Sequence, residues 1–409
     1  MTDVATRAAG PADAPRLSHR QTPRTLLLWA APALVYLGVR QLGVLVLMMM
    51  ADRHGTTAAR ELTAWDGQWF LGIAAGGYRN APAELVDAHG RRTDETPLAF
   101  FPGYPKVVGA LADLLGLPYH VAAFTVTLLC GVICSYGIYR IGVLVKGGSR
   151  RVGLILVALF AASPMGVVLS MTYSEAMFCA CASWVLVFLM RRQWLAAGFL
   201  CAIAGLVRIT AVALVLAVAV TAVVFLLRDR AARNTERLAA TASVLLAPLG
   251  LFGFLWWAGA RISPGQDVVR QILSWNELQA DGWGSSFDGG VSTAQYTVHA
   301  LATAQSAYDI GTVLVLLAAL VLAVVCCTQH RLSLPLLIYG LAVVGMVVGS
   351  AGLMNSKARL LIPAFTLLIP VAVGLARRRP STALLVLAAA ALASGWFGAH
   401  ALLVWEYAI

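Results

Sequence analysis

Long apolar runs separated by short polar stretches repeat along almost the whole 409-residue chain. A helix needs about 20 mostly apolar residues to cross a bilayer, and lipid tolerates irregular backbone only where protein or water shields it. The pattern therefore predicts an all-α polytopic membrane protein with about eleven spanning helices. The predicted spans are residues 26–50, 119–145, 152–171, 175–190, 194–208, 209–227, 238–260, 309–328, 332–352, 359–376 and 381–404.

The segments outside these spans differ in character. Residues 1–25 are polar and contain several arginines, and we expect a disordered cytoplasmic tail followed by a single transmembrane domain, residues 26–409. Two long polar segments, 51–97 and 261–308, are predicted to be outer loops, the first with interfacial helices. Prolines and charged residues interrupt 98–117, which favours an interfacial or re-entrant segment over a span.

Composition supports this picture and excludes other classes. Hydrophobic residues make up 60% of the chain and charged residues only 12%, which is not typical of a soluble globular domain. The net charge of +11 comes from short basic clusters between apolar runs, so membrane topology explains it and no nucleic-acid partner is expected. All seven cysteines lie inside apolar runs, without the spacing to histidine of a metal site, and are interpreted as small buried hydrophobes.

The distribution of basic residues predicts the orientation. If the N-terminus is cytoplasmic, the inner segments hold most of the arginine and lysine clusters, and the acidic residues collect on the other side. We therefore expect a multi-pass plasma membrane protein with a cytoplasmic N-terminus. This topology places Asp66, Glu175, Arg208, Lys357 and Arg359 near the extracytoplasmic surface, although they are far apart in the sequence.

The first outer segment contains an aspartate in an apolar setting. On a helix Asp66 shares one face with Trp69, Phe70 and Ile73, at spacings of three, four and seven. A carboxylate on the apolar side of a short amphipathic helix is costly, so it requires either a function or a structural partner, and spacing alone does not favour the function. A helix cap, or an ion pair with a nearby arginine, is the alternative.

An aromatic and proline segment follows. Residues 97–105 contain Phe101 and Tyr104 and cannot form a regular helix throughout, because prolines interrupt them. The segment is predicted either to shape a groove at the interface or to anchor the loop as part of an aromatic belt.

A second acid lies between two predicted spans. Glu175 follows Tyr173 and Ser174, and ionisable groups at membrane depth are costly and usually paired or functional. The alternative is an N-terminal cap of the next helix, where an acid suits the helix dipole.

Two arginines occupy similar positions. Arg208 lies where two spans meet without a polar loop, and Arg359 lies with Lys357 where the chain re-enters the membrane. Guanidinium groups at headgroup depth match the oxygens of an anionic phosphate. Snorkelling to ordinary lipid headgroups is the alternative for each.

These segments resemble the PIG-V type mannosyltransferases of the GT-C glycosyltransferase superfamily, a family that includes the second mannosyltransferase of GPI-anchor assembly and bacterial members. The resemblance lies in five motifs that occur in the family's order between residues 64 and 365. They are Trp65-Asp66 with Tyr78, the Phe-Phe-Pro-x-Tyr-Pro run at 100–105, Tyr173-Ser174-Glu175, Arg208, and Ser356 to Arg359. The chain departs from the family at Ile209-Thr210-Ala211 and at Leu360, which bears on the acceptor more than on the chemistry.

The resemblance implies a GT-C type bundle and an inverting transfer of a sugar, most simply mannose, from a polyprenyl-phosphate donor. The acceptor would be a hydroxyl of a lipid, glycolipid or secreted molecule on the extracytoplasmic face. Asp66 would be the general base, and Arg208, Arg359 and Lys357 would bind the donor phosphate. The residues implied in substrate binding are Trp65, Trp69, Tyr78, Phe101, Tyr104, Tyr173 and Glu175.

The leaving group in such a transfer is a monophosphate, so the resemblance implies neither a metal nor another cofactor. The role of Glu175 stays open between a second catalytic acid, a ligand of the acceptor hydroxyl and a partner of Arg208.

Two other functions fit a polytopic protein of this kind. A flippase or transporter of lipid-linked saccharide would place ionisable groups or broken helices near the bilayer midplane with access from both sides. A polymerase or ligase of the O-antigen type would use arginine and histidine in a large outer loop, where His299 is the candidate.

Overall fold

The computed structural model describes residues 23–304, 306–352, 354–405 and 407. The chain divides into two units, residues 1–31 and residues 32–409. Most of the predicted cytoplasmic tail, residues 1–22, lies outside the described residues, and helix α1 (Pro23–Arg53) begins within the last residues of that predicted segment.

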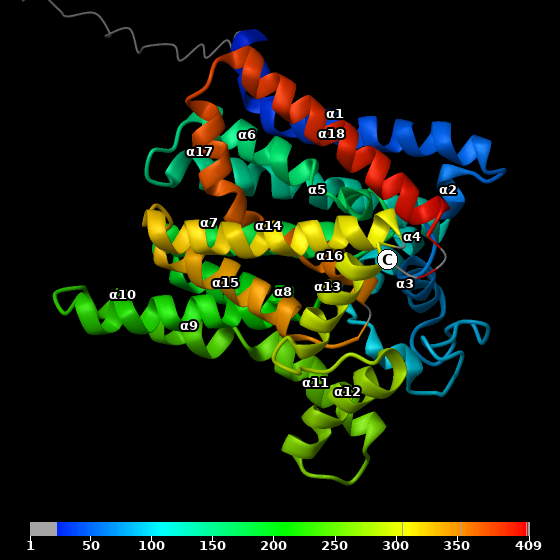
Figure 1. The fold of residues 1–409 in the computed structure, drawn as a ribbon. Coiled ribbons are helices and arrows are strands. Elements are labelled where there is room, and N and C mark those ends of the chain that lie inside the picture. Colours follow the sequence, from blue (N-terminus) through cyan, green and yellow to red (C-terminus); the bar gives the residue numbers. More distant parts are fainter. Residues whose placement is uncertain (1–22, 305, 353, 406, 408–409) are drawn as a thin grey trace, which may run out of the picture. The chain divides into compact units, whose positions relative to one another are not determined.

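The described part of residues 32–409 is built from helices, with one isolated bridge between Phe287 and Ser350 in place of a sheet (Figure 1). The α-helices after α1 are α2 (Ala58–Glu61), α3 (Asp66–Gly76), α4 (Gly103–Leu115), α5 (Tyr119–Leu144), α6 (Arg150–Ala161), α7 (Glu175–Met190), α8 (Trp194–Gly205), α9 (Ala211–Arg228), α10 (Asn234–Leu246), α11 (Leu249–Ile262), α12 (Val268–Trp283), α13 (Val291–Thr303), α14 (Ala307–Gln329), α15 (Leu334–Gly349), α16 (Lys357–Leu360), α17 (Ile369–Ala376) and α18 (Pro380–Leu403). The 3₁₀ helices are η1 (Thr96–Ala99), η2 (Gly166–Leu169), η3 (Met354–Ser356) and η4 (Ile362–Leu368).

Within the described residues, six helical stretches are long and apolar enough to cross a membrane. They are Leu27–Arg53, Tyr119–Leu144, Ala211–Arg228, Asn234–Ile262, Ala307–Gln329 and Pro380–Leu403. A seventh crossing is available if Met354–Leu360 and Ile362–Ala376, which are bent by 54° to each other, form one broken span. The chain is therefore a multi-pass membrane protein, and the predicted all-α polytopic fold is confirmed.

The structure corrects the lengths of four predicted spans. Residues 152–171, 175–190, 194–208 and 332–352 contain helices of 12, 16, 12 and 16 residues, shorter than the roughly 20 that a full crossing needs. Three of these helices, α7, α8 and α15, begin or end where polar or charged side chains face one cavity. An apolar run is visible in the sequence, whereas the point at which its helix stops depends on these local contacts.

Residues 98–117, predicted to be interfacial or re-entrant, form part of η1 and the 13-residue helix α4. Helix α4 ends at Gly116, which has a left-handed φ of 64° that a glycine adopts without strain. It packs on α5 and on α3, which belongs to the first predicted outer loop.

Helix α7 lies in the interior of the bundle and packs on α5, α8, α9 and α15. Its close contact with α5 depends on Gly137, where an added Cβ would come within 2.2 Å of Ser183 Oγ. Small residues at helix contacts allow such close packing in membrane proteins. Because α7 is buried along most of its length, its first residue, Glu175, is held firmly in the interior.

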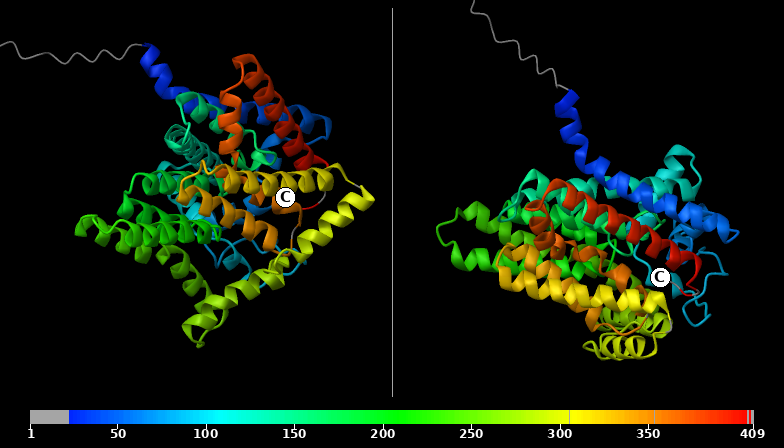
Figure 2. Two further views of the ribbon diagram at one scale, coloured as in Figure 1. Left: turned by 60° about the vertical axis from the view of Figure 1, so that its left-hand side comes forward. Right: turned by 45° about the horizontal axis from the view of Figure 1, so that its top comes forward.

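Helix α18 lies beside the part of α1 that follows residue 31 (Figure 2). A Cβ added to Gly395 would lie 3.3 Å from the Cα of Gly43, so the two helices are close at this point. Helix α14 packs on α15, α16 and η4. These contacts support the bent α16–η4–α17 segment, which contains Arg359.

The second predicted outer loop, 261–308, is mostly helical. Asp267 caps the N-terminus of α12 by accepting hydrogen bonds from the N–H groups of Val269 and Arg270. Helix α12 packs tightly on α11, where a Cβ at Gly259 would come within 1.7 Å of the Gln271 carbonyl oxygen.

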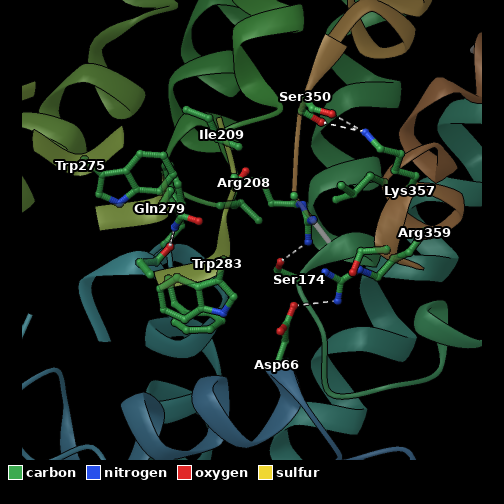
Figure 3. Close-up of a pocket in the computed structure, with 18 of the residues that line it drawn as sticks. Asp66, Ser174, Arg208, Ile209, Trp275, Gln279, Trp283, Ser350, Lys357 and Arg359 are labelled. Atoms are coloured by element: carbon green, nitrogen blue, oxygen red, sulfur yellow. Dashed lines mark hydrogen bonds and ion pairs between the residues drawn. The ribbon is translucent and has the colours of Figure 1, made fainter. Parts of the chain in front are cut away.

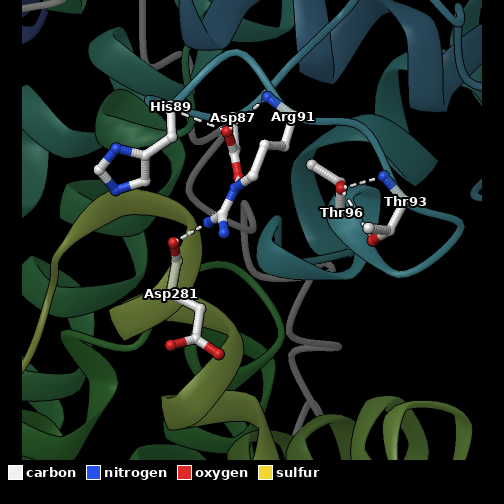
Figure 4. Close-up of polar contacts among 6 residues, drawn as sticks. All are labelled: Asp87, His89, Arg91, Thr93, Thr96 and Asp281. Carbon is white, nitrogen blue, oxygen red and sulfur yellow. Dashed lines mark hydrogen bonds and ion pairs between the residues drawn. The ribbon is translucent and has the colours of Figure 1, made fainter.

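Residues 51–97, the first predicted outer loop, are attached to the end of α12 (Figure 4). The Asp87 carboxylate accepts the N–H groups of His89 and Arg91 and pairs with Arg91 Nε at 3.1 Å. The Arg91 guanidinium donates to the carbonyl oxygen of Asp281. The N–H of Ala88 donates to the carbonyl oxygen of Gly282 at 3.0 Å. The two outer segments therefore form one joined surface.

Candidate active site

A cavity of about 210 Å³ lies where several helix ends meet (Figure 3). One wall carries charged side chains and the opposite wall carries aromatic ones. Its lining consists of Asp66, Phe70, Ala99, Phe100, Phe101, Ser174, Val207, Arg208, Ile209, Trp275, Gln279, Trp283, Ser285, Ser350, Ala351, Gly352, Ser356, Lys357, Arg359 and Leu360.

Asp66 and Arg359 form an ion pair on the charged wall. Asp66 Oδ2 lies 2.7 Å from Arg359 Nη1, although 293 positions separate the two residues in the chain. The N–H of Asp66 donates to the hydroxyl oxygen of Tyr173 at 3.2 Å, and the Arg359 guanidinium lies 5.3 Å from the centre of the Tyr173 ring. Asp66 is thus the partner of an arginine, as the ion-pair alternative anticipated, whereas the cap position of α3 belongs to Trp65 and has no side-chain cap.

Glu175 joins this pair to the second arginine. Its Oε1 lies 2.8 Å from Arg208 Nη1 and 3.6 Å from Arg359 Nε, and its side chain is 1% exposed. Arg208 Nη1 also donates to Ser174 Oγ at 2.9 Å. The structure therefore places Glu175 as a partner of Arg208, which was one of the three options for this residue.

Asp66, Arg359 and Arg208 line the cavity, and Glu175, outside the lining, lies buried between the two arginines, so the four charges alternate in sign. We call Asp66, Arg359, Glu175 and Arg208 the charge network. Two carboxylates balance two guanidiniums, which is how charges with little access to water become tolerable. Within the described residues neither carboxylate oxygen of Glu175, nor Arg359 Nε, makes a well-aligned hydrogen bond, so the network retains capacity to bind further groups.

The charge network is assembled from helix ends because these leave backbone groups without helical partners. Arg208 lies in the break between α8 and α9, and Arg359 lies in the four-residue helix α16 beside the bend. Glu175 begins α7, where the positive end of the helix dipole favours a carboxylate. Gly103 fixes the neighbouring backbone, since its N–H donates to the Leu206 carbonyl at 2.7 Å and a Cβ there would clash with it.

Lys357 lines the same cavity but its ammonium group is occupied. Nζ donates to the carbonyls of Val347 and Ser350 at 2.7 and 2.6 Å and approaches Ser350 Oγ at 3.3 Å. The side chain is buried, and it caps the C-terminal end of α15, where unpaired carbonyls attract a cation. In this arrangement Lys357 supports the wall formed by residues 350–352.

The opposite wall comes from helix α12. Trp275, Gln279 and Trp283 follow one another at intervals of four residues and so share one face of the helix. Trp275 Nε1 donates to the Leu98 carbonyl and Gln279 Nε2 to the Ala99 carbonyl, both at 3.0 Å. These hydrogen bonds attach α12 to the segment that the sequence predicted to shape a groove.

Phe101 and Phe100 complete the aromatic wall. The Phe101 ring lies 4.5 Å from that of Phe254 and 5.4 Å from that of Trp275, and Phe100 meets Trp283 edge-on at 5.8 Å. Sequence reasoning selected Phe101 but missed the α12 residues, although their four-residue spacing was visible.

Several residues expected to bind substrate lie behind the cavity wall. Trp69 is buried between the ring of Phe100 and the guanidinium of Arg92, at 5.1 Å from each. Tyr104 is fully buried, and its hydroxyl donates to the Ala123 carbonyl at 3.1 Å. Tyr173 is fully buried beneath Arg359. These rings support lining residues and are not part of the lining themselves.

Trp65 and Tyr78 also lie outside this lining. Trp65 is 37% exposed and has a positive φ of 55° at the start of α3. Tyr78 donates its hydroxyl to the Phe100 carbonyl at 2.7 Å, and burial raises the pKa of this phenol. His299 is exposed on α13 and does not line the cavity.

Among the described residues, no group of three or more His, Cys, Asp or Glu side chains is placed to hold a metal ion. The expectation that no metal or cofactor takes part stays a prediction.

Comparisons with known proteins give one part-length sequence match. No protein-family model matches the chain. The GPI mannosyltransferase pigv-1 of Caenorhabditis elegans is 30% identical over 131 residues, which cover 29% of this chain and 17% of that protein. The match agrees in kind with the PIG-V resemblance, and membership of that family stays a prediction.

Two solved structures are similar in part. ArnT from Cupriavidus metallidurans in the apo state is 16% identical with a TM-score of 0.48, covering 77% of this chain and 56% of that one. The Archaeoglobus fulgidus oligosaccharyltransferase in complex with zinc and sulfate is 13% identical with a TM-score of 0.48, covering 89% and 52%. The chain thus spans about half the length of each solved structure.

Proposed function

We propose that this protein is a membrane glycosyltransferase that moves a sugar, mannose, from a polyprenyl-phosphate donor to a hydroxyl of a lipid or glycolipid acceptor. The observation that carries the proposal is the charge network, in which Asp66 and Arg359 meet in one cavity across 293 positions of sequence. The match to a GPI mannosyltransferase over 131 residues supports the choice of mannose. We place the site at the extracytoplasmic face of the plasma membrane, because the acids gather on the side with fewer basic residues.

The cavity suits a substrate with a charged part and a sugar part. Arg208 and Arg359 present guanidinium groups that match phosphate oxygens, and they are held only 14% and 8% exposed. Across the cavity, Trp275, Trp283 and Phe101 offer ring faces and edges against which the apolar face of a sugar can pack.

The ion pair between Asp66 and Arg359 bears on the order of the reaction. Arg359 Nη1 holds Oδ2 of the Asp66 carboxylate at 2.7 Å. A donor phosphate brings negative charge to Arg359 and competes with Asp66 for the same guanidinium. Donor binding therefore releases Asp66 to accept the proton of the acceptor hydroxyl.

In the transfer, the acceptor oxygen forms a bond to the anomeric carbon while the bond from that carbon to the phosphate oxygen breaks. The bonding electron pair leaves with the phosphate, and the hydroxyl proton passes to Asp66. Attack from the side opposite the phosphate inverts the anomeric configuration. Arg208 and Arg359 stabilise the charge that develops on the departing phosphate.

Glu175 positions both arginines in this mechanism. Its contacts of 2.8 and 3.6 Å hold two like charges next to each other, which they would otherwise avoid. We assign Lys357 the support of residues 350–352 in the free enzyme, because its N–H groups point at backbone and hydroxyl oxygens.

The decisive experiment uses purified protein in nanodiscs with labelled polyprenyl-phosphomannose and a lipid extract as acceptor. Asp66→Asn is expected to lower turnover by at least about 100-fold, because an amide cannot accept the proton. The same variant is expected to bind the donor about 5-fold more tightly, because Asp66 no longer competes with the phosphate for Arg359. The part-exposed ion pair that is lost is worth about 1 kcal/mol.

Asp281→Asn serves as the matched control, because this exposed outer aspartate lies outside the cavity lining and contacts Arg91 only through its carbonyl. Full turnover in Asp66→Asn would remove Asp66 from the role of base. Movement of saccharide across the bilayer without a new glycosidic bond would replace the transferase with a flippase.

A further inference from the structure

A second hollow of about 730 Å³ lies on the other side of residues 98–100 from the reaction cavity. Leu98 lines the second hollow, whereas its neighbours Ala99 and Phe100 line the reaction cavity. The remaining walls come from the end of α3, the first outer loop and helix α11. The reaction described above uses none of its polar groups.

The hollow contains charges of both signs that do not neutralise one another. Three arginines and two acids face it, yet the side chains of Arg79, Asp94 and Glu95 make no hydrogen bond or ion pair with other described residues. Exposed ion pairs contribute little to stability, so these side chains can stay solvated and apart. Their separation around one hollow provides donors and acceptors for a ligand.

Arg92 adds an unpartnered donor. Its Nη2 donates to the Ala81 carbonyl at 3.0 Å, and its guanidinium lies over the ring of Trp69 at 5.1 Å. Its Nη1 is buried and has no hydrogen-bond partner among the described residues. A buried guanidinium N–H without an acceptor is costly, so an oxygen atom is expected there.

The aromatic side of the hollow is rigid. The rings of Tyr78 and Trp257 lie 5.3 Å apart, and the Arg261 guanidinium lies 3.8 Å from the centre of the Trp257 ring. The Tyr78 hydroxyl is fixed by its hydrogen bond to the Phe100 carbonyl. Both rings line the hollow alongside the polar groups.

This combination selects the class of ligand. A simple anion would pair with the arginines but not with Asp94 and Glu95, and a cation would pair with the acids but not with the arginines. A neutral molecule with many hydroxyl groups both donates and accepts hydrogen bonds, so it satisfies guanidiniums and carboxylates together. The volume is within the range of roughly 300–1,000 Å³ that is usual for ligand sites.

We propose that this hollow is a second saccharide-binding site, which holds a neutral oligosaccharide portion of the acceptor away from the hydroxyl that reacts. The proposal rests on the proposed transferase function for the identity of the ligand as acceptor. Binding at the hollow is independent of catalysis and is measured without donor.

The test uses the full chain carrying Asp66→Asn in nanodiscs, without donor, so that no sugar is transferred. The probes are methyl α-mannoside, a mannose trisaccharide, and the trisaccharide with a photoactivatable group, with inorganic phosphate as the anion comparison. Saturation-transfer NMR measures binding, and mass spectrometry locates the photo-crosslink. We expect saturable binding of the trisaccharide, crosslinks to residues 76–98 or 257–261, and no competition by phosphate.

Two exposed or half-exposed side chains provide the variants. Arg79→Ala and Glu95→Gln are each expected to weaken trisaccharide binding by about 5- to 10-fold, the loss of one or two hydrogen bonds. Arg60→Ala and Glu84→Gln are the matched controls, because both lie on outer segments, are exposed and do not face the hollow. Thermal unfolding is expected to be unchanged in all four, since none is buried.

The outcomes separate this inference from the proposed function. Equal trisaccharide binding in Arg79→Ala, Glu95→Gln and their controls overturns the inference, as do crosslinks confined to residues 275–283. Binding of phosphate in place of saccharide also overturns it. Saccharide bound at the hollow of Asp66→Asn, together with no sugar transfer by the unmutated chain in the donor assay, supports the inference and removes the transferase.

Discussion

The two hollows of this protein handle charge in opposite ways. In the reaction cavity the carboxylate of Glu175 is 1% exposed, and each of its charged neighbours is paired within the charge network. In the second hollow the side chains of Arg79 and Asp94 are exposed and stay apart from other charges of the described chain. Water can solvate the exposed charges of the second hollow but has little access to the charge network. Only the charge network therefore needs carboxylates and guanidiniums paired with one another.

This difference predicts how each site responds to mutation. Removing one member of the charge network leaves its partners buried and unpaired, so the effect spreads through the whole wall. Removing one charge from the second hollow changes only the contacts of that side chain with solvent or ligand.

The largest effect is expected for Arg359→Ala. This change leaves Asp66 and Glu175 without their shared partner, and we expect turnover to fall by about 1,000-fold or more and unfolding free energy by about 3–5 kcal/mol. The transfer assay measures the turnover, and chemical denaturation in detergent measures the unfolding free energy separately. Arg270→Ala, which removes half of an exposed ion pair with Glu277, is the control and is expected to cost less than 1 kcal/mol.

Arg359→Lys sharpens this prediction. An ammonium group lacks the fork by which Arg359 contacts Asp66 and approaches Glu175 together, so a retained positive charge is not expected to restore turnover. Recovery of wild-type activity by lysine would mean that charge alone, without the shared contacts, explains the arginine.

Glu175→Gln is expected to lower turnover by about 100-fold, with a larger change in KM for the donor than in KM for the acceptor. The neutral amide no longer holds Arg208 and Arg359 together, so the phosphate site loses its geometry. A double-mutant cycle with Arg208→Gln is expected to show strong coupling, since both changes break one contact.

Glu277→Gln provides the comparison for Glu175, because Glu277 is 50% exposed and lies outside the cavity lining. Additive effects of Glu175→Gln and Arg208→Gln would separate the two residues and weaken the case for a continuous network.

A smaller effect is expected for Lys357→Met. Loss of the hydrogen bonds to Val347 and Ser350 leaves carbonyls at the end of α15 unsatisfied, and unfolding free energy is expected to fall by about 1–3 kcal/mol. Donor affinity is expected to change less in Lys357→Met than in the arginine variants. Lys106→Met, at an exposed position of α4, is the control. A loss of donor binding equal to that of Arg359→Ala would instead make Lys357 a direct phosphate ligand.

The smallest effect concerns pH at the joined outer loops. Burial acts to raise the pKa of Asp87, but the N–H groups of Arg91 and His89 and the Arg91 guanidinium together hold it below its ordinary value. The resulting stabilisation of the loop is complete above the ordinary aspartate pKa of about 3.9 and is lost as pH falls through the lowered value. Hydrogen exchange of residues 81–95 between about pH 5 and pH 2.5 measures this loss.

Asp87→Asn is expected to remove this pH dependence, whereas Glu84→Gln on the same loop, exposed and without side-chain contacts to other described residues, is expected to leave it intact. An unchanged pH profile in Asp87→Asn would assign the titration to another group.

The sequence predicted the charged side of the site better than the aromatic side. Charged residues between apolar runs are visible because lipid makes them costly, and Asp66, Glu175, Arg208 and Arg359 were selected on that ground. Ring-bearing residues have no such signal. Whether Tyr104 or Trp275 is buried, or lines a cavity, depends on which helices pack beside it, and one sequence does not contain that information directly.

The spans show a similar division. Runs such as 119–145 and 309–328 were located closely, because hydrophobicity alone determines them. The ends of α8 and α15 were placed too late, because the chain stops being helical where Arg208 and the residues around Ser350 have better partners outside the helix. The second outer segment was predicted to be a loop but contains α12, whose cavity face carries mixed polar and aromatic residues.

The hydrogen bonds from Trp275 and Gln279 to the backbone at Leu98 and Ala99 have a mechanical consequence. Residues 98–100 line both hollows, and α12 is hydrogen-bonded to this segment. A rearrangement of α12 that widens the reaction cavity would pull on this segment and alter the shape of the second hollow. A structural change in one hollow can therefore reach the other directly, because both are lined by the same short segment, residues 98–100.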